Sequence, residues 1–120
     1  MPRRILLLTL VALMWPASAD AFAIGNILRR EWNRGVDVSG TYTVTGSERL
    51  TNVHLMMYNS AGAFVGSSQG TFNSVTKRWS VSGGHYALKQ YRVQFTYVNS
   101  QGRSVVVYSP VYIWTLNGLM

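Results

Sequence analysis

The chain has 120 residues, no cysteine and a net charge of +7, with eleven Lys and Arg against four Asp and Glu. A chain of this length forms one domain at most, and the lack of cysteine excludes a disulfide-stapled scaffold. A small domain without disulfides depends on one well-packed core, which favours a β-sandwich over a loop-rich fold.

The first nineteen residues predict a secretory signal peptide. A short basic start, Met1 to Arg4, precedes an apolar run over 5–15, and Ala17-Ser18-Ala19 supplies the small residues that a signal peptidase requires. The apolar run is too short to cross a bilayer core of about 30 Å as a helix. We therefore expect cleavage after Ala19, with Ala23 as the second candidate, and a secreted or periplasmic product with no membrane span.

The mature chain keeps a positive charge. Loss of Arg3 and Arg4 with the leader leaves nine basic and four acidic residues, a net charge of about +5. Such a balance favours anionic partners or surfaces, although simple solubility is an alternative explanation. Apart from Arg29-Arg30, the basic residues are scattered and form no stripe, which argues against a nucleic-acid partner.

Residues 20–34 differ from the rest of the chain. Ile24, Ile27 and Leu28 fall at helical spacing, and Asn26 could cap a short turn. This pattern predicts an N-terminal tether or a helix of one to two turns, with Trp32 holding it against the body.

From Gly35 onward the apolar pattern has the period of two that is typical of strands. The expected strands cover 40–44, 53–58, 63–65, 71–72, 78–81, 91–98 and 104–114. Short strands at this spacing, with no long helix to cover a parallel sheet, predict an all-β domain over 35–120. The expected fold is an immunoglobulin-like antiparallel β-sandwich of about seven short strands.

Two of the expected turns are alike. Asn-Ser-Ala-Gly at 59–62 and Asn-Ser-Gln-Gly at 99–102 each begin with an Asn that can bond the turning backbone and end with a Gly that tolerates positive φ. Each predicts a type I turn that closes a hairpin through a bulge.

Several segments together resemble the bacterial immunoglobulin-like (Big-type) repeat of surface adhesins, over about residues 36–114. They are GTYTV at 40–44, VHLMMYNSAG at 53–62, WSV at 79–81, YRVQF at 91–95, NSQG at 99–102 and SPVYI at 109–113. The resemblance implies that the strands of Trp79 and Tyr91 build the core. The chain departs from the family in having no tandem repeat and in lacking the acidic turn residues that often hold calcium there.

Few residues could carry out catalysis. Four acids and two histidines remain after the leader: Asp20, Glu31, Asp37, Glu48, His54 and His85. No two carboxylates share a strand face, and there is no Gly-x-Ser-x-Gly elbow or phosphate loop. Two histidines 31 positions apart make a poor metal site. We therefore expect no enzyme activity, no cofactor and no metal.

The last strand is apolar or aromatic on both faces, so one row of side chains should fill the core and the other should face outward. We expect Val105, Val107, Val111 and Ile113 to point inward with Val53, Leu55, Met57, Tyr91, Val93, Phe95 and Tyr97. The opposite face would then present His54, Met56, Tyr58, Arg92, Gln94, Thr96, Val106, Tyr108, Tyr112 and Trp114. Aromatic residues, Met and Arg are enriched in recognition surfaces, which makes Tyr58, Arg92, Tyr108, Tyr112 and Trp114 the predicted binding residues.

Three alternatives stay open for this face. Residues 20–34 or a second copy of the chain could cover it, or the rings could be exposed without a function. A bulge at Ser109-Pro110 would exchange the two rows beyond it. Pro110 also fits best on an edge strand, where a strand from another chain could be added.

The sequence thus predicts a non-enzymatic binding module that engages a protein partner. It would serve as a surface accessory component or as an inhibitor or immunity-type protein. The alternative is binding of a cell-envelope glycan or polysaccharide through Tyr58, Tyr108, Tyr112 and Trp114. A homo-oligomer is compatible with either hypothesis.

Overall fold

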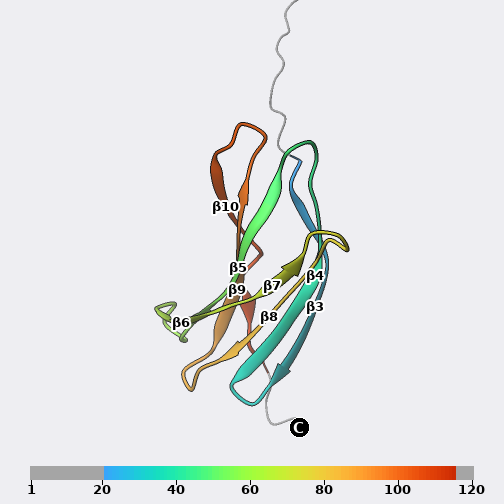
Figure 1. Cartoon of the computed structure of the whole chain (residues 1–120). Coiled ribbons are helices and arrows are strands. Elements are labelled where there is room, and N and C mark those ends of the chain that lie inside the picture. Colours follow the sequence, from blue (N-terminus) through green and yellow to red (C-terminus); the bar gives the residue numbers. More distant parts are fainter. Residues whose placement is uncertain (1–20, 116–120) are drawn as a thin grey trace, which may run out of the picture.

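The computed structural model describes residues 21–115, and these residues form two antiparallel sheets packed as a sandwich (Figure 1). The prediction of an all-β antiparallel sandwich is confirmed, and the arrangement is compatible with an immunoglobulin-like fold. The predicted signal peptide and its cleavage site after Ala19 lie outside the described residues.

The larger sheet has five strands. Its order is β10 (Ser104–Tyr108), β9 (Gln90–Val98), β5 (Arg49–Tyr58) and β6 (Phe64–Gln69), and β11 (Tyr112–Ile113) also pairs with β9. The smaller sheet has the order β3 (Ala23–Trp32), β4 (Gly35–Thr43), β8 (Arg78–Gly84) and β7 (Thr71–Asn73). The described part therefore holds nine strands. Two of them, β3 and the separate β11, add to the seven expected.

The core forms where the two sheets face each other. Alternate residues of β5 and β9 are buried as predicted: Val53, Leu55, Met57, Tyr91, Val93, Phe95 and Tyr97. From the smaller sheet, Trp79 meets Phe95 edge to face with ring centres 4.8 Å apart, and it is 2% exposed. This aromatic contact joins the two sheets at the centre of the molecule.

The expected tether or short helix at residues 20–34 is wrong for most of its length, because β3 is a ten-residue strand paired with β4. The register shifts between Gly25 and Leu28, and Asn26 has a φ of +53°. This bulge inserts one extra residue, so Ile24 and Ile27 both pack against the core although they are three positions apart. The bulge therefore produced the spacing that suggested a helix.

The two predicted Asn turns are confirmed and have matching bonds. Asn59 Oδ1 accepts from the N–H groups of Ala61 and Ala63, and Asn99 Oδ1 accepts from those of Gln101 and Arg103. Gly62 and Gly102 have φ values of +84° and +80°. A third Asn-Ser turn begins at Asn73, whose Oδ1 accepts from the N–H groups of Val75 and Thr76. The prediction had not included it.

The C-terminal strand changes faces between β10 and β11. Tyr108 is opposite Gln94 and Tyr112 is opposite Tyr91, so four steps on this strand match three on β9. Ser109 is buried, its N–H donates to the carbonyl oxygen of Val93, and its Oγ accepts from the N–H of Val93. These two bonds hold Ser109 in place, and the one extra residue lies between it and Tyr112. The two rows of side chains are therefore exchanged after Ser109.

Candidate functional site

The outer face of the five-stranded sheet carries the best candidate site, which we call the aromatic face. It consists of the outward-pointing residues Met56, Tyr58, Phe64, Arg92, Gln94, Val106 and Tyr108 of strands β5, β6, β9 and β10. Tyr108 is 43% exposed, Val106 47% and Phe64 55%. Three of the five predicted binding residues, Tyr58, Arg92 and Tyr108, lie together here.

Arg92 lies at the centre of this face, held between two tyrosines. Its guanidinium carbon is 3.8 Å from the ring centre of Tyr108 and 5.7 Å from that of Tyr58. Its Nε donates to the hydroxyl of Tyr58 at 3.1 Å. The register explains the position, since Arg92 is opposite Met56 on β5 and lies diagonally between the two rings.

Neighbouring contacts hold the two tyrosines in place. Gln94 Nε2 donates to the Tyr108 hydroxyl at 3.1 Å, and Phe64 meets the Tyr58 ring edge to face with centres 6.0 Å apart. A shallow depression of about 160 Å³ lies beside them, lined by Tyr58, Gly62, Gln90, Arg92 and Val111. The face is therefore a set of preorganised side chains that lose little conformational entropy on binding.

The charge on Arg92 is not neutralised within the described part of the chain. No hydrogen bond or ion pair joins its two Nη atoms to another residue between 21 and 115. Of the three acids in that range, Glu31 contacts Arg29, Asp37 contacts Arg30, and Glu48 accepts from backbone groups. The aromatic face thus presents an arginine whose Nη atoms can donate to a ligand.

The structure places the other two predicted binding residues, Tyr112 and Trp114, on the opposite side of the sheet. Because the rows exchange after Ser109, both residues pack against the core, whereas Val111 and Ile113 are 50% and 58% exposed. The expectation that Val111 and Ile113 point inward is therefore wrong. Tyr112 and Trp114 belong to a second cluster between the two sheets, which we call the seam: Arg29, Glu31, Tyr91, Tyr112 and Trp114.

The seam is covered by the N-terminal strand and its turn. Arg29 lies 4.3 Å from the ring centre of Tyr112, and Trp114 Nε1 donates to the carbonyl oxygens of Trp32 and Gly35 at 3.2 and 3.0 Å. Glu31 Oε1 accepts from the N–H of Thr115 at 3.0 Å. Within the segment expected to be a tether, β3 thus does cover predicted binding residues, but only the pair that lies in the seam.

The charges of the seam are satisfied internally. Arg29 Nη1 donates to the Tyr91 hydroxyl at 2.9 Å, and that hydroxyl donates to Glu31 Oε2 at 2.8 Å. Burial, together with the bond to Glu31, raises the pKa of Tyr91 above its ordinary value, so the hydroxyl stays protonated and can donate. The bond to Tyr91 in turn raises the pKa of Arg29.

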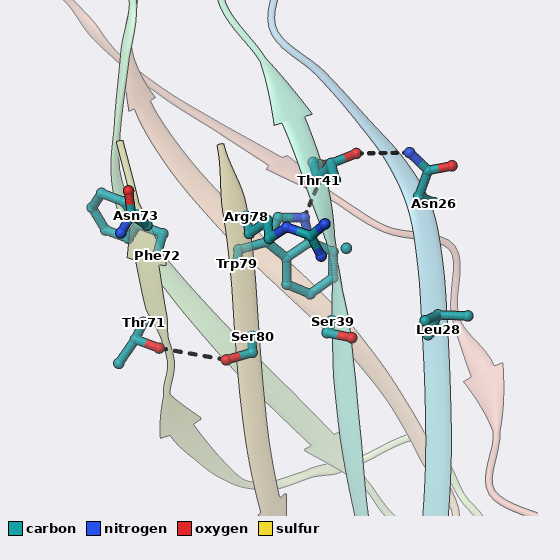
Figure 2. A pocket seen from close by; sticks show the side chains of 11 residues that line it. Asn26, Leu28, Ser39, Thr41, Thr71, Phe72, Asn73, Arg78, Trp79 and Ser80 are labelled. Carbon is teal, nitrogen blue, oxygen red and sulfur yellow. Dashed lines mark hydrogen bonds between the residues drawn. The ribbon is translucent and has the colours of Figure 1, made fainter. Parts of the chain in front are cut away.

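The outer face of the four-stranded sheet has a different composition. A hollow of about 620 Å³ lies on this face, and Figure 2 shows Thr71 directed at Ser80 and Asn26 at Thr41 there. The hollow also includes Ser39, Arg78 and one exposed apolar side chain, Leu28. Its two aromatic residues are less open than those of the aromatic face, since Trp79 is buried and Phe72 is half-buried and packed against the core, so we place the candidate site on the other sheet.

The histidines have structural surroundings. His85 Nδ1 accepts from the N–H of Ala87 at 3.0 Å, and its ring stacks on Tyr86. His54 Nδ1 is buried on β5 without a hydrogen-bond partner among the described residues. No group of three or more His, Asp or Glu within residues 21–115 could hold a metal ion. The described residues also include no helix long and apolar enough to span a membrane.

Comparison with known proteins finds no matching family model, curated protein or solved structure. The description of the site therefore depends on the geometry of this chain alone. Sequence reasoning missed Phe64, which lies opposite Tyr58 because of the register between β5 and β6. The signal for it was available, since Phe64 follows the Asn59 turn and so begins the partner strand of the hairpin.

Proposed function

We propose that the protein is a secreted or periplasmic, non-enzymatic binding module that engages a protein partner with its aromatic face. The observation that carries the proposal is Arg92, half-buried between Tyr58 and Tyr108 with no carboxylate among the described residues beside it. Arg and Tyr are the residues that most often dominate binding energy at protein interfaces. The partner should present a carboxylate to the Nη atoms of Arg92 and apolar side chains to the surrounding rings.

The positive charge of the chain supports an acidic partner. An acidic surface would approach the aromatic face without meeting a described carboxylate on it, since Glu31, Asp37 and Glu48 all lie elsewhere. An inhibitor or immunity-type protein, or an accessory component of the cell surface, would use such a face. The resemblance to bacterial immunoglobulin-like repeats is compatible with either role.

The glycan alternative receives less support from the geometry. Sugar rings stack on open aromatic faces, whereas one face of Tyr108 is occupied by Arg92. Of the other proposed rings, Tyr112 lies under Arg29, and the indole of Trp114 has Lys89 Nζ at 5.5 Å from its ring centre. The four residues therefore do not form one platform.

Site-specific photocrosslinking tests the proposal in the native host. A benzoylphenylalanine replaces Val106, which is exposed on the aromatic face, or Leu28, which is 71% exposed on the opposite sheet. We expect one discrete crosslinked protein from position 106, lost when Arg92→Ala is added, and none from position 28. Equal crosslinking from both positions would contradict the proposal.

Two further outcomes separate the alternatives. A crosslinked product with twice the mass of the mature chain would show that the face binds a second copy instead of a different protein. Crosslinking that disappears on addition of envelope polysaccharide would favour the glycan hypothesis.

A further inference from the structure

Two connections at one end of the sandwich expose aromatic rings. They are the turn at 32–35 between β3 and β4 and the loop at 85–89 between β8 and β9, both at the lower end of the molecule in Figure 1. The register pairs Gly35 with Gly84, so the two connections lie side by side. Tyr86 is 76% exposed and Trp32 is 40% exposed. We call residues 32–35 and 85–89 the tip.

Hydrogen bonds hold the two connections of the tip together. The N–H of His85 donates to the carbonyl oxygen of Arg34 at 2.9 Å, and Arg34 Nη1 donates to the carbonyl oxygen of Tyr86 at 2.6 Å. The Trp32 indole lies against Gly35, where an added Cβ would come within 2.3 Å of the ring. The tip therefore presents its two rings from a fixed backbone, so little conformational entropy is lost when they bind.

The tip also carries positive charge. Arg34 and Lys89 are exposed, and neither has a carboxylate partner among residues 21–115. Glu31 and Asp37, the acids in the adjoining strands, are each paired with another arginine, at 3.7 and 3.9 Å. Trp and Tyr rings favour the headgroup level of a bilayer, where one end of the ring is apolar and the other is hydrated. Lys and Arg beside them are attracted to anionic headgroups.

The opposite end of the sandwich differs from the tip in its rings and not in its charge. Arg49 and Arg103 are exposed there, at the start of β5 and beside the turn at 99–103. Val75 is the large exposed apolar side chain in the turn between β7 and β8, and no described aromatic ring is exposed at that end. Of the two ends, only the tip thus combines exposed rings with cations in the described part of the chain.

We propose that the tip docks the protein on the surface of a bilayer that contains anionic phospholipids. Trp32 and Tyr86 enter the headgroup region, and Arg34 and Lys89 contact lipid phosphates. The attachment is peripheral and reversible, because a few interfacial side chains bind far more weakly than a spanning segment. Arg92 lies on the outer face of the five-stranded sheet and not at the tip, so this inference goes beyond the proposed function and does not rest on it.

Vesicle sedimentation tests the inference with the purified protein, expressed as the full chain in a bacterial host. Vesicles of phosphatidylglycerol and phosphatidylcholine in equal parts are compared with vesicles of phosphatidylcholine alone. We expect binding to the anionic vesicles to be tighter by about ten-fold or more, since each cation near such a surface contributes about five-fold. Absence of binding, or equal binding to both kinds of vesicle, would overturn the inference.

Substitutions at the two ends locate the contact. Tyr86→Ser and Arg34→Ala should each weaken binding to the anionic vesicles by about five-fold. The matched variants at the opposite end, Val75→Ser and Arg103→Ala, should leave binding unchanged. All four side chains are exposed, so Tm should change little in each variant. Equal losses at the two ends would show that net charge alone attracts the protein, which contradicts docking by the tip.

A fluorescent label reports which end enters the bilayer. The chain contains no cysteine, so Asn33→Cys in the tip or Ser74→Cys at the opposite end provides a single site for an environment-sensitive dye. Both residues are exposed polar residues in turns. We expect the anionic vesicles to shift the emission of the dye at position 33 to shorter wavelength and to leave that at position 74 unchanged. An unchanged spectrum at position 33, or an equal shift at position 74, would refute the docking geometry.

Discussion

The molecule contains two arginine–tyrosine clusters that differ in how their charge is satisfied. In the seam, Arg29 lies over Tyr112 and shares Tyr91 and Glu31, and Trp114 beside it is bonded to the turn after β3. On the aromatic face, Arg92 lies over Tyr108 and Tyr58 without a carboxylate among the described residues. An arginine that lies over tyrosine rings therefore holds the two sheets together in the seam, whereas on the aromatic face the same arrangement is available to a ligand.

The comparison shows that an aromatic residue in a strand does not by itself indicate a binding surface. Tyr108 ends β10 and Tyr112 begins β11, four residues apart, yet only Tyr108 is on the outer face. The extra residue after Ser109 turns Tyr112 toward the other sheet. There Tyr112 lies under Arg29, whose charge is paired with Glu31.

Loss of Trp114 should have the largest effect. Trp114→Ala removes the bonds to Trp32 and Gly35 together with the packing of a partly buried indole, so we expect the free energy of unfolding to fall by about 3 kcal/mol. Tyr108→Ala, on the aromatic face, should cost less than about 1 kcal/mol. Urea denaturation of the two variants measures both values, and equal losses would contradict the distinction between seam and face.

The two arginines should separate binding from stability. Arg92→Ala should weaken binding to the crosslinked partner by about 30-fold or more, about 2 kcal/mol, while Tm changes little. Arg29→Ala should lower Tm and leave binding of the partner nearly unchanged, because it leaves Glu31 and Tyr91 without their cation. Arg78→Ala on the opposite sheet is the matched control and should change neither quantity. Calorimetric titration and thermal melts provide the comparison.

The seam should also show a specific response to alkali. The pKa of Tyr91 is raised in the folded protein, so the stability it provides is complete below about pH 10, the ordinary tyrosine pKa, and is lost as the pH rises further. Tyr91→Phe should cost about 1–2 kcal/mol at neutral pH, since it removes bonds to two charged groups. It should also make the loss of stability above pH 10 shallower, although not absent, because burial raises the pKa of Tyr42 as well. Chemical denaturation between pH 7 and 11 tests this.

The smallest expected effect is that of salt. An exposed contact between Arg92 and a carboxylate is screened at high ionic strength, so raising NaCl from 50 to 500 mM should weaken partner binding by a few-fold. The Arg92→Ala variant should lose this dependence. A salt response that is unchanged in the variant would show that other charges control the association.

Much of the fold could be predicted because β5 and β9 have one buried face and a period of two. The structure confirms the predicted turns at Asn59 and Asn99. It also confirms the predicted inward residues of the two strands: Val53, Leu55, Met57, Tyr91, Val93, Phe95 and Tyr97. The N-terminal strand could not be predicted from periodicity, because the bulge at Asn26 gives Ile24 and Ile27 a helical spacing.

The candidate site was predictable only as far as the register was regular. Tyr58, Arg92 and Tyr108 were placed on one face by simple alternation, and they meet there. Tyr112 and Trp114 were placed on the wrong face. A bulge at Ser109-Pro110 is one of the alternatives that the sequence leaves open, but spacing alone could not choose it, because the bulge depends on tertiary bonds between Ser109 and Val93. The stacking of Phe22 on Tyr97, with ring centres 4.4 Å apart, likewise depends on how the two sheets pack.

Methyl NMR of the mature protein, titrated with the crosslinked partner, tests the central claim most directly. The aromatic face carries the methyl groups of Met56 and Val106, whereas Leu28 and Val75 are exposed elsewhere on the molecule. We predict chemical-shift changes at Met56 and Val106 that saturate with the binding curve, while Leu28 and Val75 stay unchanged. Changes at Leu28 or Val75 without changes at Met56 and Val106 would contradict the account.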